Sequence, residues 1–168
     1  MTLKSDATNP PAKQWLVLAG FVALCLAVGS VAGWATNQSV ATWYVTLNRP
    51  SWTPPGWVFA PVWTVLYIMM GVAAWRIWRA GGGFTGEARS ALIVFFVQLT
   101  FNFTWSLAFF AARSTLLGLI TITALWLTIA LAISVFRPID RFAAWLLAPY
   151  LLWVSFAAAL NFAFWYLN

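Results

Sequence analysis

The sequence predicts an all-α, polytopic membrane protein folded as a bundle of five transmembrane helices. Hydrophobic residues make up 63% of its 168 residues and charged residues 7%, whereas a soluble domain carries roughly 25% charged residues. A chain this small cannot cover its surface with so few charges, so part of that surface must face something other than water, and lipid is the simplest candidate. The apolar residues also gather in five runs long enough to cross about 30 Å of hydrocarbon as helices. None of the runs alternates as a membrane β-strand would.

The five runs define one membrane domain, which we place at residues 15–168 after a polar tail of residues 1–14. The first run lacks a clear signal-peptide cleavage site, so we interpret it as a membrane span. A glycine-rich turn, a two-residue link and a charged turn separate the last four runs from one another. The predicted spans are 15–33, 57–78, 90–112, 115–136 and 142–167.

The segment between the first two spans, residues 34–56, is unusually aromatic and contains Pro50, Pro54 and Pro55. Proline fixes its own φ and disfavours helix in the residue before it, so we expect an extended and stiff loop that folds back on the helices. Two interpretations remain open for this loop. It forms a lid over a pocket, or its aromatic side chains anchor the protein at the membrane interface.

The net charge of +6 is scattered between the apolar runs and forms no continuous patch, so it does not indicate nucleic-acid binding. An uneven distribution across the membrane predicts a cytoplasmic N-terminus if the protein lies in a plasma membrane. For a Gram-negative source the outer membrane is the alternative location, and the rule does not extend to it. One side receives Lys4, Lys13, Arg76, Arg79, Arg89, Arg137 and Arg141, and the other receives Arg49 and Arg113.

The residue inventory disfavours several kinds of chemistry. The chain has no histidine, and its lone cysteine, Cys25, lies within an apolar run. The acids Asp6, Glu87 and Asp140 all lie outside the predicted spans, so a proton relay through the membrane has no carriers. We therefore expect no metal site, no required cofactor and no conventional catalytic residues.

Weaker polar groups inside the spans are spaced as if on helix faces. Gln98 and Asn102 lie four residues apart, and Trp105 and Phe109 continue the same stripe. These faces should point into the bundle, because amides in lipid need hydrogen-bond partners. The amides either tie the helices together or contribute to an aromatic cavity for a large, flat, apolar ligand. Similar stripes are formed by Trp63 and Tyr67, and by Tyr150, Trp153, Ala157 and Asn161.

Several motifs, in order along the chain from about residue 15 to its end, resemble those of the TspO/MBR family, also called translocator proteins, peripheral benzodiazepine receptors or tryptophan-rich sensory proteins. The first loop carries Trp43-Tyr44, Leu47 and Arg49-Pro50-Ser51-Trp52-Thr53-Pro54-Pro55-Gly56. The later helices carry Pro61-Val62-Trp63-Thr64, Leu66-Tyr67, Met70-Gly71, Gln98-Leu99, Asn102, Trp105, Phe109-Phe110, Pro149-Tyr150, Trp153, Ala157 and Leu160-Asn161.

The resemblance implies a five-helix bundle, often a homodimer, with a pocket beneath the first loop among the first, second, third and fifth helices. It implies binding of tetrapyrroles such as protoporphyrin IX and, in some members, of benzodiazepine-type ligands and sterols. The form Leu/Val, Tyr, Lys/Arg of the sterol motif is not met at the end of this chain. The ligand-binding residues carried over are Tyr44, Pro54, Pro55, Trp63, Tyr67, Gln98, Asn102, Trp105, Phe109, Trp153, Ala157 and Leu160.

We therefore expect a membrane receptor or carrier that binds protoporphyrin IX and other flat apolar ligands, with a role in sensing, sequestration or transport. One alternative is light-dependent degradation of a bound porphyrin, in which Trp63 and Trp153 would donate electrons. The other is a structural or partner-modulating membrane protein whose pocket is incidental.

Overall fold

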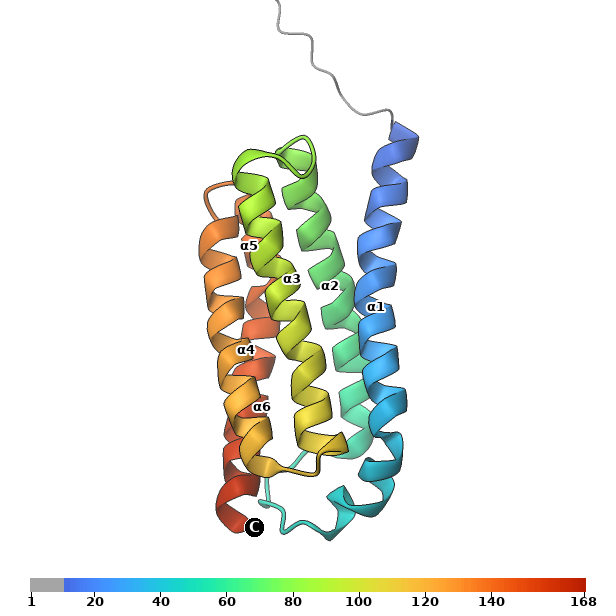
Figure 1. Ribbon diagram of the computed structural model, residues 1–168, viewed down its shortest axis with the longest axis vertical. Helices are drawn as coiled ribbons and strands as arrows, with labels where there is room; N and C mark the ends of the chain where they lie inside the picture. The colour runs from blue at the N-terminus through green and yellow to red at the C-terminus, as the bar shows by residue number, and fades with distance from the viewer. Residues whose placement is uncertain (1–10) are drawn as a thin grey trace, which may run out of the picture.

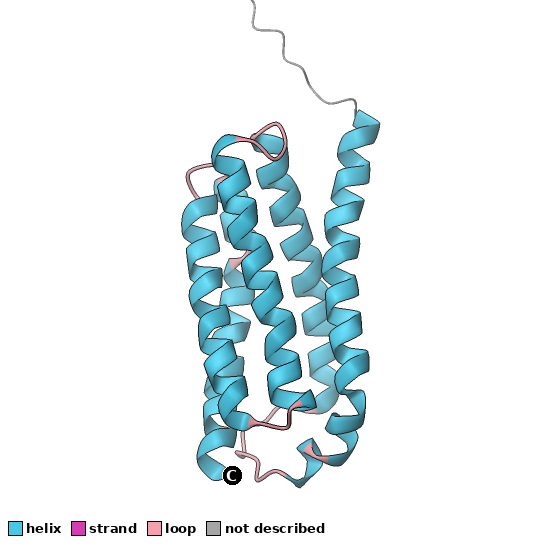
Figure 2. Ribbon diagram, viewed as in Figure 1, coloured by secondary structure: helices cyan, strands magenta, loops and turns pink. Residues whose placement is uncertain are grey.

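The computed structural model describes residues 11–168, and within that range the regular elements are helices (Figures 1 and 2). Five helical segments of this range are long and apolar enough to cross a membrane, which confirms the predicted fold class. The elements in order are α1 (Pro11–Thr42), η1 (Tyr44–Thr46), η2 (Gly56–Val58), α2 (Phe59–Ala80), α3 (Gly86–Ser106), η3 (Leu107–Ala111), α4 (Thr115–Phe136), α5 (Arg141–Leu146) and α6 (Ala148–Leu167).

The helices run alternately up and down, so the connections gather at two ends of the bundle (Figure 1). The α1–α2 loop (residues 43–58), the α3–α4 link and the end of α6 share one end, which we call the loop end. The α2–α3 and α4–α5 turns share the other, which we call the basic end because it holds Lys13, Arg76, Arg79, Arg89, Arg137 and Arg141.

The first helix is longer than predicted, and this corrects two boundaries. Residues 34–42 belong to α1 and not to the loop, and residues 11–14 are helical as well. The polar residues after Trp34 suggested a loop, but Thr36 and Ser39 are buried against the bundle. The Thr36 hydroxyl donates a hydrogen bond to the Ala32 carbonyl at 2.8 Å, which satisfies it within the helix. Residues 1–10 of the predicted tail lie outside the described range.

The last span is broken where the sequence predicted one helix over 142–167. Helix α5 ends at Leu146 and α6 begins at Ala148, while the apolar window continues from Arg141 to Leu167. Pro149 lies in the first turn of α6, where its missing N–H costs nothing, although in an uninterrupted helix its ring would clash with the carbonyl four residues earlier. Proline therefore divides this span into two helices.

Close helix contact places α1 beside the pocket described below. Helix α1 packs along α2, and a Cβ built on Gly71 of α2 would lie 2.7 Å from the Val22 Cα. Only glycine permits this approach of two backbones. The main core lies among all the helices of the bundle, and its fully buried side chains include Phe95 of α3, Ile129 of α4 and Tyr150 of α6.

At the basic end an ion pair joins α2 to the start of α5. Arg76 lies 2.8 Å from Asp140, which also accepts hydrogen bonds from the backbone N–H groups of Phe142 and Ala143. Burial of Asp140 opposes its ionisation, but the backbone donors and the Arg76 guanidinium outweigh that effect and lower the pKa of the carboxyl. Asp140 therefore caps α5 as an anion.

Candidate functional site

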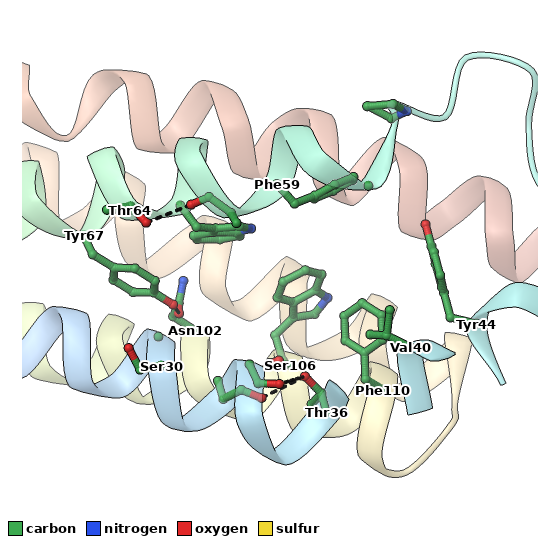
Figure 3. Close-up of a pocket in the computed structure, with 18 of the residues that line it drawn as sticks. Ser30, Thr36, Val40, Tyr44, Phe59, Thr64, Tyr67, Asn102, Ser106 and Phe110 are labelled. Atoms are coloured by element: carbon green, nitrogen blue, oxygen red, sulfur yellow. Dashed lines mark hydrogen bonds between the residues drawn. The ribbon is translucent and has the colours of Figure 1, made fainter. Parts of the chain in front are cut away.

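A pocket of about 460 Å³ lies beneath the α1–α2 loop, enclosed by α1, α2 and α3 (Figure 3). This volume falls in the range of small-molecule sites. Its lining is mostly apolar and aromatic, with seven hydroxyl groups, one amide and one cation. The lining residues are Leu26, Gly29, Ser30, Ala32, Gly33, Thr36, Val40, Tyr44, Arg49, Thr53, Pro54, Gly56, Phe59, Ala60, Trp63, Thr64, Tyr67, Asn102, Trp105, Ser106 and Phe110.

The inner end of the pocket is held by a chain of hydrogen bonds across three helices. The Tyr67 hydroxyl donates to Oδ1 of Asn102 at 2.5 Å, and Nδ2 of Asn102 donates to the Tyr150 hydroxyl at 2.9 Å. Asn102 is 2% exposed, so its partners replace the water that the membrane interior lacks. One asparagine thereby couples α2, α3 and α6 at the point where the pocket closes.

Glycine in α1 makes room for this arrangement. A Cβ built on Gly29 would lie 2.2 Å from the nearest ring carbon of Tyr67, well inside van der Waals contact. The Tyr67 ring therefore occupies the volume that any larger residue at position 29 would need. Gly29 sets how deep the pocket reaches between α1 and α2.

Indole rings form the wall of the pocket between α2 and α3. The Trp63 ring centroid lies 5.6 Å from that of Tyr67 and 6.0 Å from that of Trp105. The Trp105 indole N–H donates to Oδ1 of Asn161 at 3.2 Å, and Nδ2 of Asn161 donates to the Thr115 carbonyl at 2.8 Å. These contacts fix the orientation of the rings, so the wall is preformed.

The loop covers the pocket with Tyr44 and Arg49. Tyr44 packs on Phe110 and Phe164, at centroid distances of 5.6 and 5.3 Å. The Arg49 guanidinium lies 5.0 Å from the Tyr44 ring centroid, a cation–π contact. Burial raises the pKa of Tyr44, and the charge of Arg49 offsets part of the rise. The pocket mouth therefore carries a positive charge on a stiff aromatic support.

Six of the twelve predicted ligand-binding residues line this pocket together, namely Tyr44, Pro54, Trp63, Tyr67, Asn102 and Trp105. The other six do not line it. Their assignment to ligand binding stays a prediction, and so does that of the first six. The six outside the lining are Pro55, Gln98, Phe109, Trp153, Ala157 and Leu160.

The residues outside the lining have other surroundings. Phe109 and Leu160 belong to a small apolar cluster with Phe164 beneath the loop. Trp153 packs against Phe59 at 5.8 Å and against Phe156 at 5.5 Å, and Ala157 belongs to the main core. The residues predicted on the fifth membrane span therefore do not line this cavity. Its walls come from α1, α2 and α3.

Gln98 is fully buried, and neither its amide nitrogen nor its oxygen has a hydrogen-bond partner within residues 11–168. The other amides of the predicted stripes, Asn102 and Asn161, do tie helices together. The helix-tying interpretation therefore holds for the asparagines and not for the glutamine.

The lining residues of α1 were not predicted from the sequence. Gly29, Gly33, Thr36 and Val40 follow one another at spacings of four, three and four, which places them on one helix face. That spacing was the available signal, but small residues on a membrane helix equally indicate helix packing.

The fold and the pocket define a class: a five-span integral membrane protein with an aromatic cavity under its first loop. A model of the TspO/MBR family matches residues 21–167, and the chain belongs to that family. The tryptophan-rich protein TspO of Chlorobaculum tepidum is 44% identical over 93% of this chain and 98% of its own length.

Two further relatives extend the comparison. The translocator protein of Sus scrofa is 36% identical, covering 92% of this chain and 91% of its own length. The tryptophan-rich sensory protein of Cereibacter sphaeroides is 35% identical, covering 89% of each chain. Bacterial and animal relatives therefore match nearly the whole of the membrane domain.

Proposed function

We propose that this protein binds a flat, apolar ligand that carries carboxylates, of which protoporphyrin IX is the type, as a membrane receptor or carrier in sensing, sequestration or transport. The observation that carries the proposal is the pairing of preformed indole walls with one cation, Arg49, at the pocket mouth. Aromatic faces suit the ring of a tetrapyrrole, and a guanidinium suits its propionates.

The polar groups at the inner end of the pocket indicate how the ligand would be oriented. Both groups of the Asn102 amide are already engaged, by Tyr67 and Tyr150. A charged ligand group placed there would have to break those bonds, whereas at the mouth Arg49 is exposed and its guanidinium makes a long hydrogen bond of 3.5 Å to the Tyr44 carbonyl. The apolar ring should therefore lie inward and the carboxylates outward.

A titration of the detergent-solubilised protein with protoporphyrin IX in the dark, followed by tryptophan fluorescence, tests the proposal. We expect saturable quenching that weakens in Trp63→Phe and in Arg49→Gln, with folding checked by circular dichroism. Trp145→Phe is the matched control, because Trp145 is 73% exposed and lies outside the pocket lining. Nonsaturating quenching that is the same in all variants would mean that the porphyrin partitions into the micelle and would overturn the proposal.

Protoporphyrin dimethyl ester separates the two parts of the proposed recognition. The ester keeps the ring and loses both charges, so we expect Arg49→Gln to leave its binding unchanged while weakening that of the acid. Equal loss for acid and ester would show that Arg49 supports the loop and does not bind carboxylate. Repeating the titration under illumination, with porphyrin absorbance followed over time, reports any light-dependent turnover.

A further inference from the structure

A second, shallower pocket lies at the basic end, on the far side of the membrane domain from the first. It is lined by Ser134, Arg137, Pro138, Ile139 and Arg141. Arg137 caps the end of α4 and Arg141 opens α5. Pro138 lies between them and cannot continue the helix without cost. The turn therefore brings two exposed arginines to one pocket.

Neither arginine is neutralised by a carboxylate within residues 11–168. Asp140 lies between them in sequence, but it pairs with Arg76 at 2.8 Å. Its second oxygen accepts the N–H groups of Phe142 and Ala143. The acid is thus oriented toward α2 and the start of α5 and is absent from the pocket lining. The pocket keeps the charge of both guanidinium groups.

Several other polar groups of the pocket already have hydrogen-bond partners within the fold. The backbone N–H of Arg137 donates to the Ile133 carbonyl at 3.1 Å, and that of Ile139 to the Phe136 carbonyl at 3.0 Å. The Ser134 hydroxyl donates to Leu131 at 2.7 Å, and Pro138 has no N–H. The two guanidinium groups are therefore the side-chain donors left for a ligand, and their planar forks match phosphate oxygens.

The pocket lies where a membrane meets water. Helix α4 ends at Phe136 and the next apolar window begins at Arg141. Phe142 and Trp145, close to the pocket in sequence, are 56% and 73% exposed, as is typical of aromatic side chains at the headgroup level. An apolar stripe leads away from the pocket along α4, because Leu127 and Leu131 are 58% and 49% exposed and precede Ser134 at helical spacing.

We propose that Arg137 and Arg141 bind the phosphate of an anionic phospholipid headgroup, with an acyl chain lying along Leu127 and Leu131. The stripe favours a lipid over a free phosphate ion, since an acyl chain can pack against apolar side chains and a free ion cannot. Basic pockets at helix ends are a recurrent mode of lipid headgroup recognition. This site is separate from the porphyrin pocket, so either proposal stands if the other fails.

Native mass spectrometry of the purified protein in detergent tests the site by comparing phosphatidylglycerol, phosphatidylcholine and inorganic phosphate. The variants are Arg137→Gln, Arg141→Gln and both together, with folding checked by circular dichroism. Arg89→Gln is the matched control, because Arg89 is an exposed arginine at the same end outside the pocket.

We expect wild type to retain phosphatidylglycerol in preference to phosphatidylcholine. Each single variant should weaken phosphatidylglycerol binding about fivefold, which corresponds to about 1 kcal/mol per arginine at a membrane surface. The double variant should lose the preference, and Arg89→Gln should keep it. An unchanged preference in the folded double variant, or an equal loss in Arg89→Gln, would overturn the site. Displacement of the lipid by inorganic phosphate at matched concentration would show a free-anion site instead.

Discussion

Asn48 and Asn168, which lie 120 residues apart in the sequence, are joined by a reciprocal pair of hydrogen bonds. The backbone N–H of Asn48 donates to Oδ1 of Asn168 at 2.9 Å, and Nδ2 of Asn168 donates to the Asn48 carbonyl at 3.2 Å. The Asn48 side chain adds a third bond, to the Leu167 carbonyl at 3.2 Å. The loop over the pocket is therefore fastened to the end of α6.

Breaking this fastening should loosen the loop without unfolding the bundle. We expect Asn168→Ala to speed amide hydrogen exchange over residues 43–58 and to raise the rate of protoporphyrin IX release. The cost in stability should be small, about 1 kcal/mol or less, since these bonds are exposed and water competes for them. Asn37→Ala, which changes an exposed asparagine in α1, is the control. Exchange rates in the loop that match those of wild type would contradict the proposed fastening.

The asparagine that joins three helices should matter more for stability. Asn102→Ala leaves the hydroxyls of Tyr67 and Tyr150 without their amide partner, so we expect a loss of about 1–3 kcal/mol in the free energy of unfolding in detergent. Tyr67→Phe removes one bond and should cost about 0.6 kcal/mol, the average for hydrogen bonds between membrane helices. Tyr166→Phe, at a residue 77% exposed, is the control. An Asn102→Ala variant as stable as this control would refute the role assigned to the amide.

Two glycines of α1 offer a matched pair of substitutions. Gly29→Ala places a methyl group 2.2 Å from a Tyr67 ring carbon, whereas a Cβ at Gly33 meets nothing within 4 Å. We expect Gly29→Ala to lower stability by about 1–3 kcal/mol, as overpacking does, and to weaken ligand binding by displacing Tyr67. Gly33→Ala should fold at least as well as wild type, because alanine favours helix. Thermal unfolding of both variants checks the prediction, and equal melting temperatures would contradict it.

The ion pair at the basic end predicts a loss of stability in acid. The pKa of Asp140 is lowered in the folded protein from an ordinary value of 3.8. Its contribution is therefore fully present above that value and is lost as the pH falls through the folded pKa. We expect thermal stability to drop below about pH 4 in wild type and to drop less in Asp140→Asn, which has no charge to lose.

Glu87→Gln serves as the control for this pH dependence, because Glu87 makes no ion pair within the described part of the chain. Its acid profile should follow that of wild type. A wild-type profile that stays flat down to pH 2, or an Asp140→Asn profile that keeps the full drop, would show that the ion pair does not stabilise the fold.

The number and order of the membrane spans could be predicted because hydropathy and length are local properties of the chain. The break at Pro149 and the continuation of α1 through residues 34–42 were not predicted from the sequence, and each was missed for its own reason. A membrane helix tolerates proline when neighbouring groups satisfy the backbone carbonyl that loses its hydrogen bond. Proline is therefore a weak signal of a helix boundary in a membrane span. Asn37 and Gln38 resemble loop residues, yet they lie on the exposed side of a helix whose other face is buried.

Only part of the candidate site was predicted from the sequence. Trp63, Tyr67, Asn102 and Trp105 lie on faces marked by polar or aromatic spacing, and the structure brings them together. Trp153 and Ala157 show the same kind of spacing on α6 but pack into other surroundings. A stripe shows that a face is distinctive, but it does not show which neighbouring helix that face meets.

The sequence by itself determined the membrane class, the five spans, the uneven distribution of charge and the resemblance to one family, since each of these can be read from residues close together in the chain. The tertiary structure alone decided that α6 contributes no lining residue to the pocket, that Asn48 meets Asn168, and that Arg137 and Arg141 share a pocket. Lipid and protein core are both apolar, so hydrophobicity does not orient a membrane helix about its axis. Close packing at Gly29 and Gly71 and the hydrogen bonds of Asn102 set that rotation instead.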